Sequence, residues 1–352
     1  MKVKIIDPSK DKRWDEFVLD HKFGSIYHHS YWKELIHRTY GHIPVYFVLE
    51  EDGGKLRAAM PFFMIRSWLT GTRLVSLPFS SFCDPLVNTQ EEFATLLHAS
   101  MAAMARFHAS YLEIRTQKSY ELCKSPELKE YFNYKSHILP LNSDLQTLRE
   151  SFHKTSVQQR IRRAERNNVM VRVGTNDEDI RVFYRLHSLT RKKHGLPPRP
   201  YKFFRNMWHL MHSKGLVTLL LAEHDGRAAA GILLLKFKDR VYYEYVGTDK
   251  RFLRYNPNHI LLWKAIEMAW EEGFRYFDFG VTPQKNTGLM DFKRKWGTEE
   301  HEMPYLYFPD VKGYKKSLGQ NTENSCWLTK IGHTVYSELG RIAGRIFYKH
   351  LG

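Results

Sequence analysis

The stretch VTLLLAEHDGRAAAGILLLKF, residues 217–237, decides the fold. It predicts an apolar strand, a turn at Asp225-Gly226 and a second apolar strand. Asp-Gly between β-rich runs is a strong hairpin signal, because glycine adopts the positive φ that the turn requires. The stretch VYFVLEEDGGKLRAAMPFFMI, residues 45–65, has the same pattern with its turn at 52–54. Two hairpins of the same chemistry in the two halves of the chain indicate an internal repeat.

The sequences on either side of the hairpins repeat in the same order. Upstream, each half predicts a short strand and two helices; downstream it predicts a third strand, a long apolar helix and a short strand. In the first half the flanking elements are expected at 3–6, 14–21, 31–40, 93–107 and 111–115. In the second half they are expected at 169–173, 177–194, 201–214, 258–272 and 275–279. Each half therefore predicts the order β-α-α-β-β-β-α-β, with a further strand at 136–141 or 305–308.

This duplication predicts an α/β (α+β) protein of two tandem domains with mixed central sheets. At 352 residues the chain is long enough for each domain to bury a core. We expect domains at 1–143 and 169–312, joined by a basic helical linker at 144–168. A tail with an amphipathic helix is expected at 313–352.

Composition excludes several classes of protein. Hydrophobic residues at 43% and aromatic residues at 14% exclude a disordered chain. No apolar run approaches the ~18 residues of a spanning helix, and the N-terminus lacks a signal peptide, so we expect a cytoplasmic protein. The three cysteines and eighteen histidines show no metal-ligand spacing, so no metal is expected.

The net charge of +16 predicts a partner that carries phosphate. Nucleic acid, a nucleotide-linked substrate and an anionic membrane face all fit, and charge alone does not choose among them. Arg160, Arg163 and Arg166 recur every three residues and share one helix face. That face is either solvated or binds phosphate.

Apolar residues at helical spacing form a stripe along residues 327–351. This helix either packs on the protein, which we favour, or lies as a basic amphipathic helix on the inner face of the membrane.

Three motifs in the second half carry a resemblance to a known family. Asn256-Pro257-Asn258-His259 opens the long helix, DFG ends the next strand at 278–280, and GLMDFKRKWG follows at 288–297. The element order resembles the GNAT fold of N-acyltransferases. The tandem pair with its F-K-x-x-W-G run resembles the FemABX family, aminoacyl-tRNA-dependent ligases that add amino acids to peptidoglycan precursors. The match is closer to the compact FemAB-related proteins found beside exopolysaccharide and exosortase gene clusters. The resemblance implies two tandem GNAT-like domains.

Two departures from these families bear on the donor. GNAT enzymes hold the coenzyme A pyrophosphate on a glycine-rich turn, but the corresponding stretch here, RYNPNH at 254–259, has no glycine. Pro257 also removes an amide donor, which argues against acetyl-CoA binding in the usual mode. The long coiled-coil arm of some FemABX members is absent from the sequence, because no sustained heptad run interrupts either half.

The resemblance implies catalytic roles for the F-K-x-x-W-G run. Lys293 would stabilise the tetrahedral oxyanion or hold the phosphate-bearing end of the donor, and Phe292 would stack on a tRNA terminus. Without the resemblance, spacing alone favours a helix anchored by Phe292 and Trp296, with Lys293 solvated. Asp278 either orients or deprotonates the amine, or accepts the amides of its turn, which we favour.

The remaining candidates would bind substrate. Asn258 either caps the long helix or lies at a helix start whose free amides bind phosphate. Tyr245 and His194 are weaker candidates to line the cleft. The predicted substrate-binding residues are Phe292, Trp296, Tyr245, Asn256, Asn258, His259, His194, Arg160 and Arg163.

Three functions follow as hypotheses. The first is a FemAB-type transferase that moves an aminoacyl or acyl group from an activated ester, aminoacyl-tRNA, to an amine of a nucleotide-linked or lipid-linked cell-envelope precursor, without a cofactor. The second is an acyl-CoA-dependent N-acyltransferase of exopolysaccharide or lipid-precursor biosynthesis. The third is a non-catalytic basic adaptor that binds RNA or a membrane surface.

Overall fold

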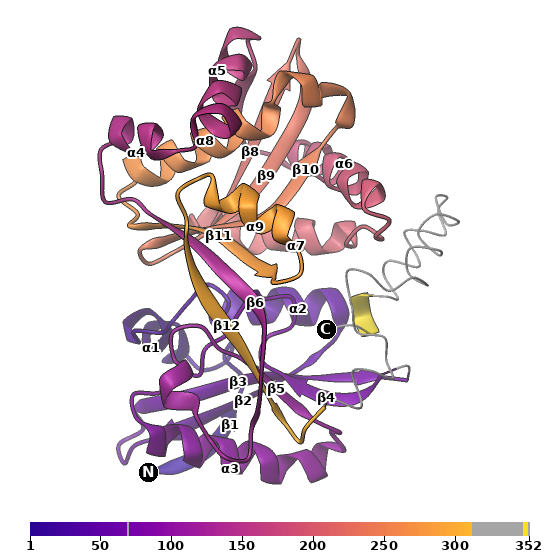
Figure 1. Cartoon of the computed structure of the whole chain (residues 1–352). Coiled ribbons are helices and arrows are strands. Elements are labelled where there is room, and N and C mark those ends of the chain that lie inside the picture. Colours follow the sequence, from indigo (N-terminus) through magenta and orange to yellow (C-terminus); the bar gives the residue numbers. More distant parts are fainter. Residues whose placement is uncertain (69, 312–347, 351–352) are drawn as a thin grey trace. The chain divides into compact units, whose positions relative to one another are not determined.

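The structure, a computed structural model, describes residues 1–68, 70–311 and 348–350 (Figure 1). These residues divide into two compact units. Unit 1 contains residues 1–134, 302–311 and 348–350, and unit 2 contains residues 135–301. The amphipathic helix expected at 327–351 lies almost entirely outside the described residues, as does Cys326. No helix in the described part of the chain is long and apolar enough to cross a membrane.

Unit 1 is built on a mixed sheet. Its strands, in spatial order, are β1 (Lys2–Ile6), β2 (Ile43–Glu50), β3 (Leu56–Ser67), β4 (Gly71–Val75), β5 (Leu112–Arg115) and β12 (Glu299–Phe308). The pairs are antiparallel except β4 with β5, which is parallel. The helices are α1 (Trp14–Asp20), α2 (Ser30–Tyr40), α3 (Gln90–Phe107) and the short η1 (Tyr120–Cys123). Apolar side chains of α3, β2 and β3 share one core, so α3 covers one face of this sheet.

Unit 2 repeats this plan. Its strands, in spatial order, are β6 (Lys129–Pro140), β11 (Tyr276–Pro283), β10 (Arg240–Thr248), β9 (Arg227–Phe237), β8 (Val217–His224) and β7 (Met170–Gly174). Strands β7 to β10 pair antiparallel, and β10 pairs parallel with β11. The longer helices are α4 (Leu145–Ser151), α5 (Gln159–Arg166), α6 (Asp177–Lys193), α7 (Tyr201–Met211), α8 (Pro257–Glu271) and α9 (Thr287–Arg294). Short helical turns are η2 (Lys154–Gln158), η3 (His212–Lys214) and η4 (Lys250–Tyr255).

Helices cover both faces of the sheet in unit 2. Ala230, Ile232 and Leu234 of β9 lie in one core with the apolar residues of α5 and α8. Gly231, between them, faces the other way, and a Cβ there would lie 3.1 Å from Phe183 of α6. This alternation is the period-2 pattern of a strand buried on both faces.

The predicted repeat is confirmed. Both hairpins form, as β2-β3 and β8-β9, and both expected further strands are present, as β6 and β12. In the second hairpin Asp225 has φ 50° and Gly226 has φ 67°, the positive values that a two-residue turn requires. Each half therefore follows the predicted order, with mixed central sheets.

Residues 144–168 differ from the separate linker that the sequence suggested. They form α4, η2 and α5, and they belong to unit 2. The reason is a line of apolar side chains buried in the core that α8 also lines: Leu148, Phe152, Val157, Ile161 and Ala164. Their steps are three to five residues, and the five-residue step falls where η2 is a π-helical turn. Packing of this apolar line therefore fixes α5 on the body of unit 2.

Strand β10 passes closest to α6 at Gly247. A Cβ on Gly247 would lie 2.3 Å from the backbone nitrogen of His187 and 2.6 Å from the backbone carbon of Leu186. Since both atoms are backbone, a side chain at this position forces the strand or the helix to move. Only glycine fits this contact.

We expect Gly247→Ala to lower the free energy of unfolding by about 1–3 kcal/mol, the usual cost of overpacking a close contact. Gly288→Ala in α9 is the matched control, because its Cβ meets nothing within 4 Å. Urea unfolding followed by circular dichroism compares the two variants. Equal stability of Gly247→Ala and the unaltered protein would contradict the close approach of β10 to α6.

Candidate functional site

The F-K-x-x-W-G run forms α9 and the turn after it, next to the end of β11. The side chain of Asn286 caps α9 by accepting the N–H of Leu289. Met290, Lys293 and Trp296 follow at three-residue steps, and all three are buried. Trp296 is fully buried, which confirms that it anchors the helix. The alternative in which Lys293 is solvated is wrong, because Lys293 lies on the same buried side of the helix.

Lys293 is held by the backbone of β11. Its side chain is 4% exposed, and its Nζ donates to the carbonyl oxygens of Gly280 at 3.0 Å and Val281 at 3.4 Å. A buried ammonium without such acceptors would cost several kcal/mol. Gly280 adopts the left-handed conformation, with φ +73°, which few other residues tolerate. The end of β11 therefore holds a cation in a dry position.

Asp278 supports the same strand end. It is 2% exposed; Oδ2 accepts from Nη1 of Arg240 at 2.8 Å, and Oδ1 accepts the N–H of Gly280 at 2.8 Å. Because both oxygens are engaged, the geometry favours the turn-stabilising interpretation over a general base. Sequence reasoning missed Arg240, since the register that pairs β10 with β11 is not visible in the residue pattern.

His137 of β6 is a second residue that sequence reasoning missed. It is fully buried, and neither ring nitrogen has a hydrogen-bond partner among the described residues. Nδ1 lies 3.7 Å from Oε1 of Glu300. Burial, and next the positive charge of Lys293, lower the pKa of His137 to about 4. A neutral imidazole therefore lies near Lys293 at pH 7.

An aromatic cluster joins three of the predicted substrate-binding residues. The ring of His259, at the start of α8, lies 6.2 Å from Phe292 and 6.1 Å from Trp296. Phe292 is half-buried, so part of its ring remains accessible. Burial, followed by the positive charge of Arg160, lowers the pKa of His259 to about 4. The starts of α8 and α5 and the end of α9 thus meet at this cluster.

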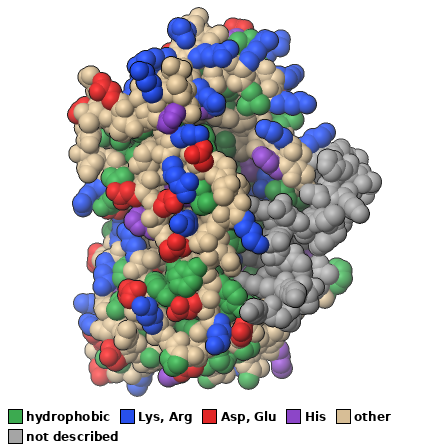
Figure 2. Space-filling model, viewed as in Figure 1, with side chains coloured by type: hydrophobic (Ala, Val, Ile, Leu, Met, Phe, Trp, Pro, Cys, Tyr) green, Lys and Arg blue, Asp and Glu red, His purple; other side chains and the backbone are tan. Residues whose placement is uncertain are grey.

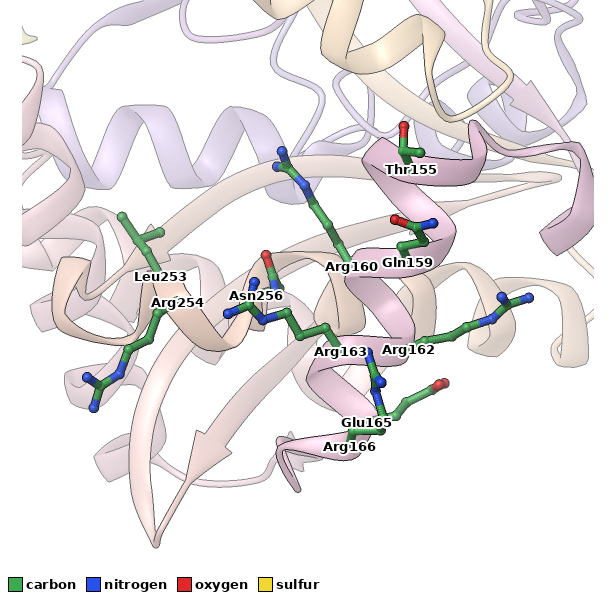
Figure 3. Close-up of a pocket in the computed structure, with 10 residues that line it drawn as sticks. All are labelled: Thr155, Gln159, Arg160, Arg162, Arg163, Glu165, Arg166, Leu253, Arg254 and Asn256. Carbon is green, nitrogen blue, oxygen red and sulfur yellow. The ribbon is translucent and has the colours of Figure 1, made fainter.

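Arg160, Arg163 and Asn256 line one pocket (Figure 3). It is an open hollow of about 1130 Å³ between α5 and η4. Figure 2 shows Lys and Arg side chains gathered on the part of unit 2 that carries α5 and α8. The full lining is Thr155, Gln159, Arg160, Arg162, Arg163, Glu165, Arg166, Leu253, Arg254 and Asn256. Five guanidinium groups against one carboxylate make the pocket strongly positive, and Arg162 and Arg254 were not singled out from the sequence.

The start of α8 differs from the prediction. We expected Asn258 as the cap, which is wrong: the helix begins at Pro257, and the residue before it is Asn256 in the left-handed conformation with φ 54°. Proline is favoured at the first helical position because its φ is already set and its missing N–H has no partner there. The side chain of Asn258 instead accepts a hydrogen bond from Oγ1 of Thr248 at 2.8 Å.

The two weaker candidates lie elsewhere in unit 2. Tyr245 is 5% exposed and packs against Phe203 and Phe204 of α7, at 5.6 and 5.4 Å between ring centres. His194 is an exposed residue at the end of α6. Within the described ranges, no group of three or more His, Cys, Asp and Glu side chains could hold a metal ion.

We expect Asp278→Asn to lower the free energy of unfolding by about 3–5 kcal/mol, because it leaves the Arg240 guanidinium buried without a counter-charge. Glu272→Gln is the matched control: its pair with Lys236 is partly exposed, so the loss should stay below about 1 kcal/mol. Guanidinium unfolding measures both variants. A loss for Asp278→Asn as small as that of the control would show that the ion pair is dispensable.

A second expectation concerns pH. Unfolded histidine takes up its proton near pH 6.5, whereas folded His137 stays neutral down to about pH 4. The unfolded state therefore binds more protons in this window, and stability falls as the pH is lowered through it. We expect His137→Phe to reduce the slope of unfolding free energy against pH by about one proton. His301→Phe, at a half-exposed position, should leave the slope unchanged; equal slopes in all three proteins would contradict a neutral His137.

Comparison with known proteins places the fold. A model of the acetyltransferase (GNAT) domain matches residues 151–294. The UDP-N-acetylmuramoylpentapeptide-lysine N(6)-alanyltransferase of Weissella viridescens is 20% identical over 319 residues, which cover 81% of this chain and 88% of the relative. The lipid II:glycine glycyltransferase of Staphylococcus haemolyticus (strain JCSC1435) is 36% identical over 89 residues, 23% of this chain and 21% of the relative.

Solved structures agree on the architecture. The crystal structure of FemX has a TM-score of 0.73 at 18% identity, and the match covers 90% of this chain and 100% of that one. A tandem GNAT protein from the clavulanic acid biosynthesis pathway has a TM-score of 0.55 at 11% identity, covering 87% and 97%. These likenesses concern the fold, whereas the sequence relatives are aminoacyltransferases by name. The duplicated GNAT-like fold and relatives of this kind support one conclusion: the chain is similar to the FemABX-related transferases.

Proposed function

We propose that this protein transfers an aminoacyl group from aminoacyl-tRNA to an amine of a cell-envelope precursor that is linked to a nucleotide or a lipid. The observation that carries the proposal is the buried Lys293, fixed on the carbonyl oxygens of Gly280 and Val281. The names of the relatives support the acceptor class, since one modifies a lysine of UDP-N-acetylmuramoylpentapeptide and the other acts on lipid II.

The chemistry is the aminolysis of an ester. The amine nitrogen attacks the acyl carbon, a C–N bond forms, and negative charge develops on the acyl oxygen. The C–O bond to the donor then breaks, and the leaving hydroxyl takes the proton that the amine loses. Because an ester is already activated, the main requirement is a cation where the oxyanion develops. A preorganised ammonium in a dry site meets that requirement without reorganisation during the reaction.

Asp278 has a positioning role in this proposal. Its carboxylate binds the N–H of Gly280, and the carbonyl of Gly280 binds Lys293. The Arg240–Asp278 pair thus acts on the reaction through Lys293. His259, Phe292 and Trp296 form an aromatic cluster beside the same helix, and the accessible part of Phe292 suits the base or ribose at a donor's end.

The alternative donor, an acyl-CoA, has one observation in its favour, the GNAT model that matches residues 151–294. The start of α8 argues against it. GNAT enzymes hold the pyrophosphate on glycine-rich backbone amides, but here Pro257 has no N–H, and the side chain of Asn258 is bound to Thr248. Transfer from acyl-CoA without tRNA would overturn our proposal in favour of this alternative.

Lys293→Met is the decisive variant. Methionine keeps an unbranched side chain only one heavy atom shorter and removes the charge, so we expect kcat to fall about 10²–10³-fold, as when one oxyanion donor is lost. The assay mixes the purified protein with charged tRNA and either UDP-N-acetylmuramoylpentapeptide or lipid II, and follows product mass.

Lys295→Met is the matched control, two residues along the chain, because Lys295 is partly exposed and pairs with Asp291. It should keep the kcat of the unaltered protein. Circular dichroism checks that both variants fold. A folded Lys293→Met protein with undiminished kcat would exclude Lys293 from the reaction. Absence of transfer by the unaltered protein from either donor would favour the non-catalytic adaptor.

A further inference from the structure

The arginine pocket has no role in the transfer step itself, and its charge is not neutralised within the described part of the chain. No ion pair is recorded there for its five arginines: Arg160, Arg162, Arg163, Arg166 and Arg254. The single carboxylate in the lining, Glu165, is paired at 2.9 Å with Arg149. Like charges held this closely repel one another, and a bound polyanion removes that cost. The charge of the pocket therefore favours the binding of an anionic ligand.

The arginines are also held in place rather than scattered along a mobile helix. Ile161 and Ala164 of α5 are fully buried in the core that α8 lines, so the helix cannot rotate about its axis. Arg254 belongs to the separate turn η4 and lines the same pocket, although its guanidinium group points away from α5 (Figure 3). Packing on one side thus presents guanidinium groups on the other, and preorganised guanidinium groups lose less entropy when they bind phosphate.

Spacing indicates the size of the ligand. Arg160, Arg163 and Arg166 are three residues apart, which places their α-carbons over about 9 Å along the helix axis. Phosphates along one strand of duplex DNA advance by about 3.4 Å of helix axis per nucleotide, and the axial rise of an RNA duplex is somewhat smaller. The row therefore matches two to three nucleotide steps, whereas a single pyrophosphate would occupy only one end of it. The arginine fork also suits backbone phosphates, which present two oxygens each.

The pocket continues toward the reaction site. Asn256 lines it, and three residues later His259 touches the rings of Phe292 and Trp296. The charge of Arg160 acts on His259, which shows that the pocket and the aromatic cluster are neighbours within unit 2. An RNA strand bound along α5 can thus direct its end to Phe292 and to the α9 helix that carries Lys293.

We infer that the pocket between α5 and η4 binds the sugar-phosphate backbone of an RNA strand, and that this strand is the stem next to the acylated end of the donor. This inference rests on the proposed function for the identity of the RNA. It assigns Arg160, Arg163 and Arg254 to the holding of the donor, and it predicts no role for them in the chemical step.

Binding is tested first, with an uncharged RNA hairpin that ends in single-stranded CCA. Fluorescence anisotropy at several salt concentrations should give a slope of log K against log[salt] of about −3.5 to −4.5 for five phosphate contacts. Arg160→Gln/Arg163→Gln should weaken binding at least tenfold and reduce that slope by about 1.4–1.8. The control Lys202→Gln/Arg205→Gln removes the same charge from α7 and should change neither quantity.

Two further experiments test whether the pocket binds other phosphate-bearing ligands in place of RNA. Coenzyme A at millimolar concentration should leave the hairpin bound, and vesicles of phosphatidylglycerol should show no binding that depends on Arg160 and Arg163. Displacement of the hairpin by coenzyme A, arginine-dependent binding to the vesicles, or an unchanged slope in the double variant would each overturn the inference.

Kinetics separate this inference from the proposed function. With full-length charged tRNA, Arg160→Gln/Arg163→Gln should raise KM at least tenfold and leave kcat unchanged. With a minimal donor, an aminoacylated CCA trinucleotide, the variant should match the unaltered protein, because no stem reaches the pocket. Arginine-dependent hairpin binding without any transfer would support the pocket and contradict the function. Transfer with an unchanged KM would support the function and contradict the pocket.

Discussion

The buried ion pair between Arg240 and Asp278 fixes the end of β11. One carboxylate oxygen of Asp278 binds the guanidinium, and the other binds the N–H of Gly280. The carbonyl oxygen of the same glycine binds Lys293. Three charged side chains on three elements are therefore linked through one glycine whose conformation is left-handed. Removal of any member leaves a charge or a polar group buried without its partner, so the arrangement is cooperative.

Unit 2 uses positive charge in two different ways. At the end of β11 the charges are buried, few and fully coordinated, which suits a fixed electrostatic role at one atom. On α5 they are exposed, numerous and without ion pairs recorded among the described residues, which suits a long anion that exchanges with solvent. The aromatic cluster of His259, Phe292 and Trp296 lies between these two kinds of site. The order from pocket to rings to lysine matches the order of backbone, terminal nucleoside and acyl group in the donor that we propose, aminoacyl-tRNA.

The fold could be predicted from the sequence because its signals are local. Asp225-Gly226 predicted the hairpin, and both residues have the positive φ that the turn needs. The burial of Trp296 followed from its spacing to Phe292 in one short motif. The predicted start of α8, at residue 258, was one residue too late. Asn258 is a residue type that is favoured as a helix cap, but the helix already begins at Pro257.

The parts of the site that could not be predicted depend on tertiary pairing. Arg240 meets Asp278 because β10 and β11 are parallel neighbours, and no residue pattern shows that register. Lys293 can be buried because carbonyl oxygens of β11 accept hydrogen bonds from its Nζ. A lysine in an isolated helix is expected in solvent. His137 is one of eighteen histidines, and only its burial beside Lys293 distinguishes it.

The course of the chain through the two units has a consequence for biosynthesis. The chain leaves unit 1 within β6 and returns to it within β12, so residues 135–301 are inserted into unit 1. At about 5–20 residues per second, the ribosome needs roughly 8–33 s to cross that insertion. Until β12 emerges, the backbone groups of β5 that it will pair with are unsatisfied, and such an edge recruits other chains. The nascent protein thus passes through an interval in which chaperones protect an incomplete sheet or aggregation competes with its completion.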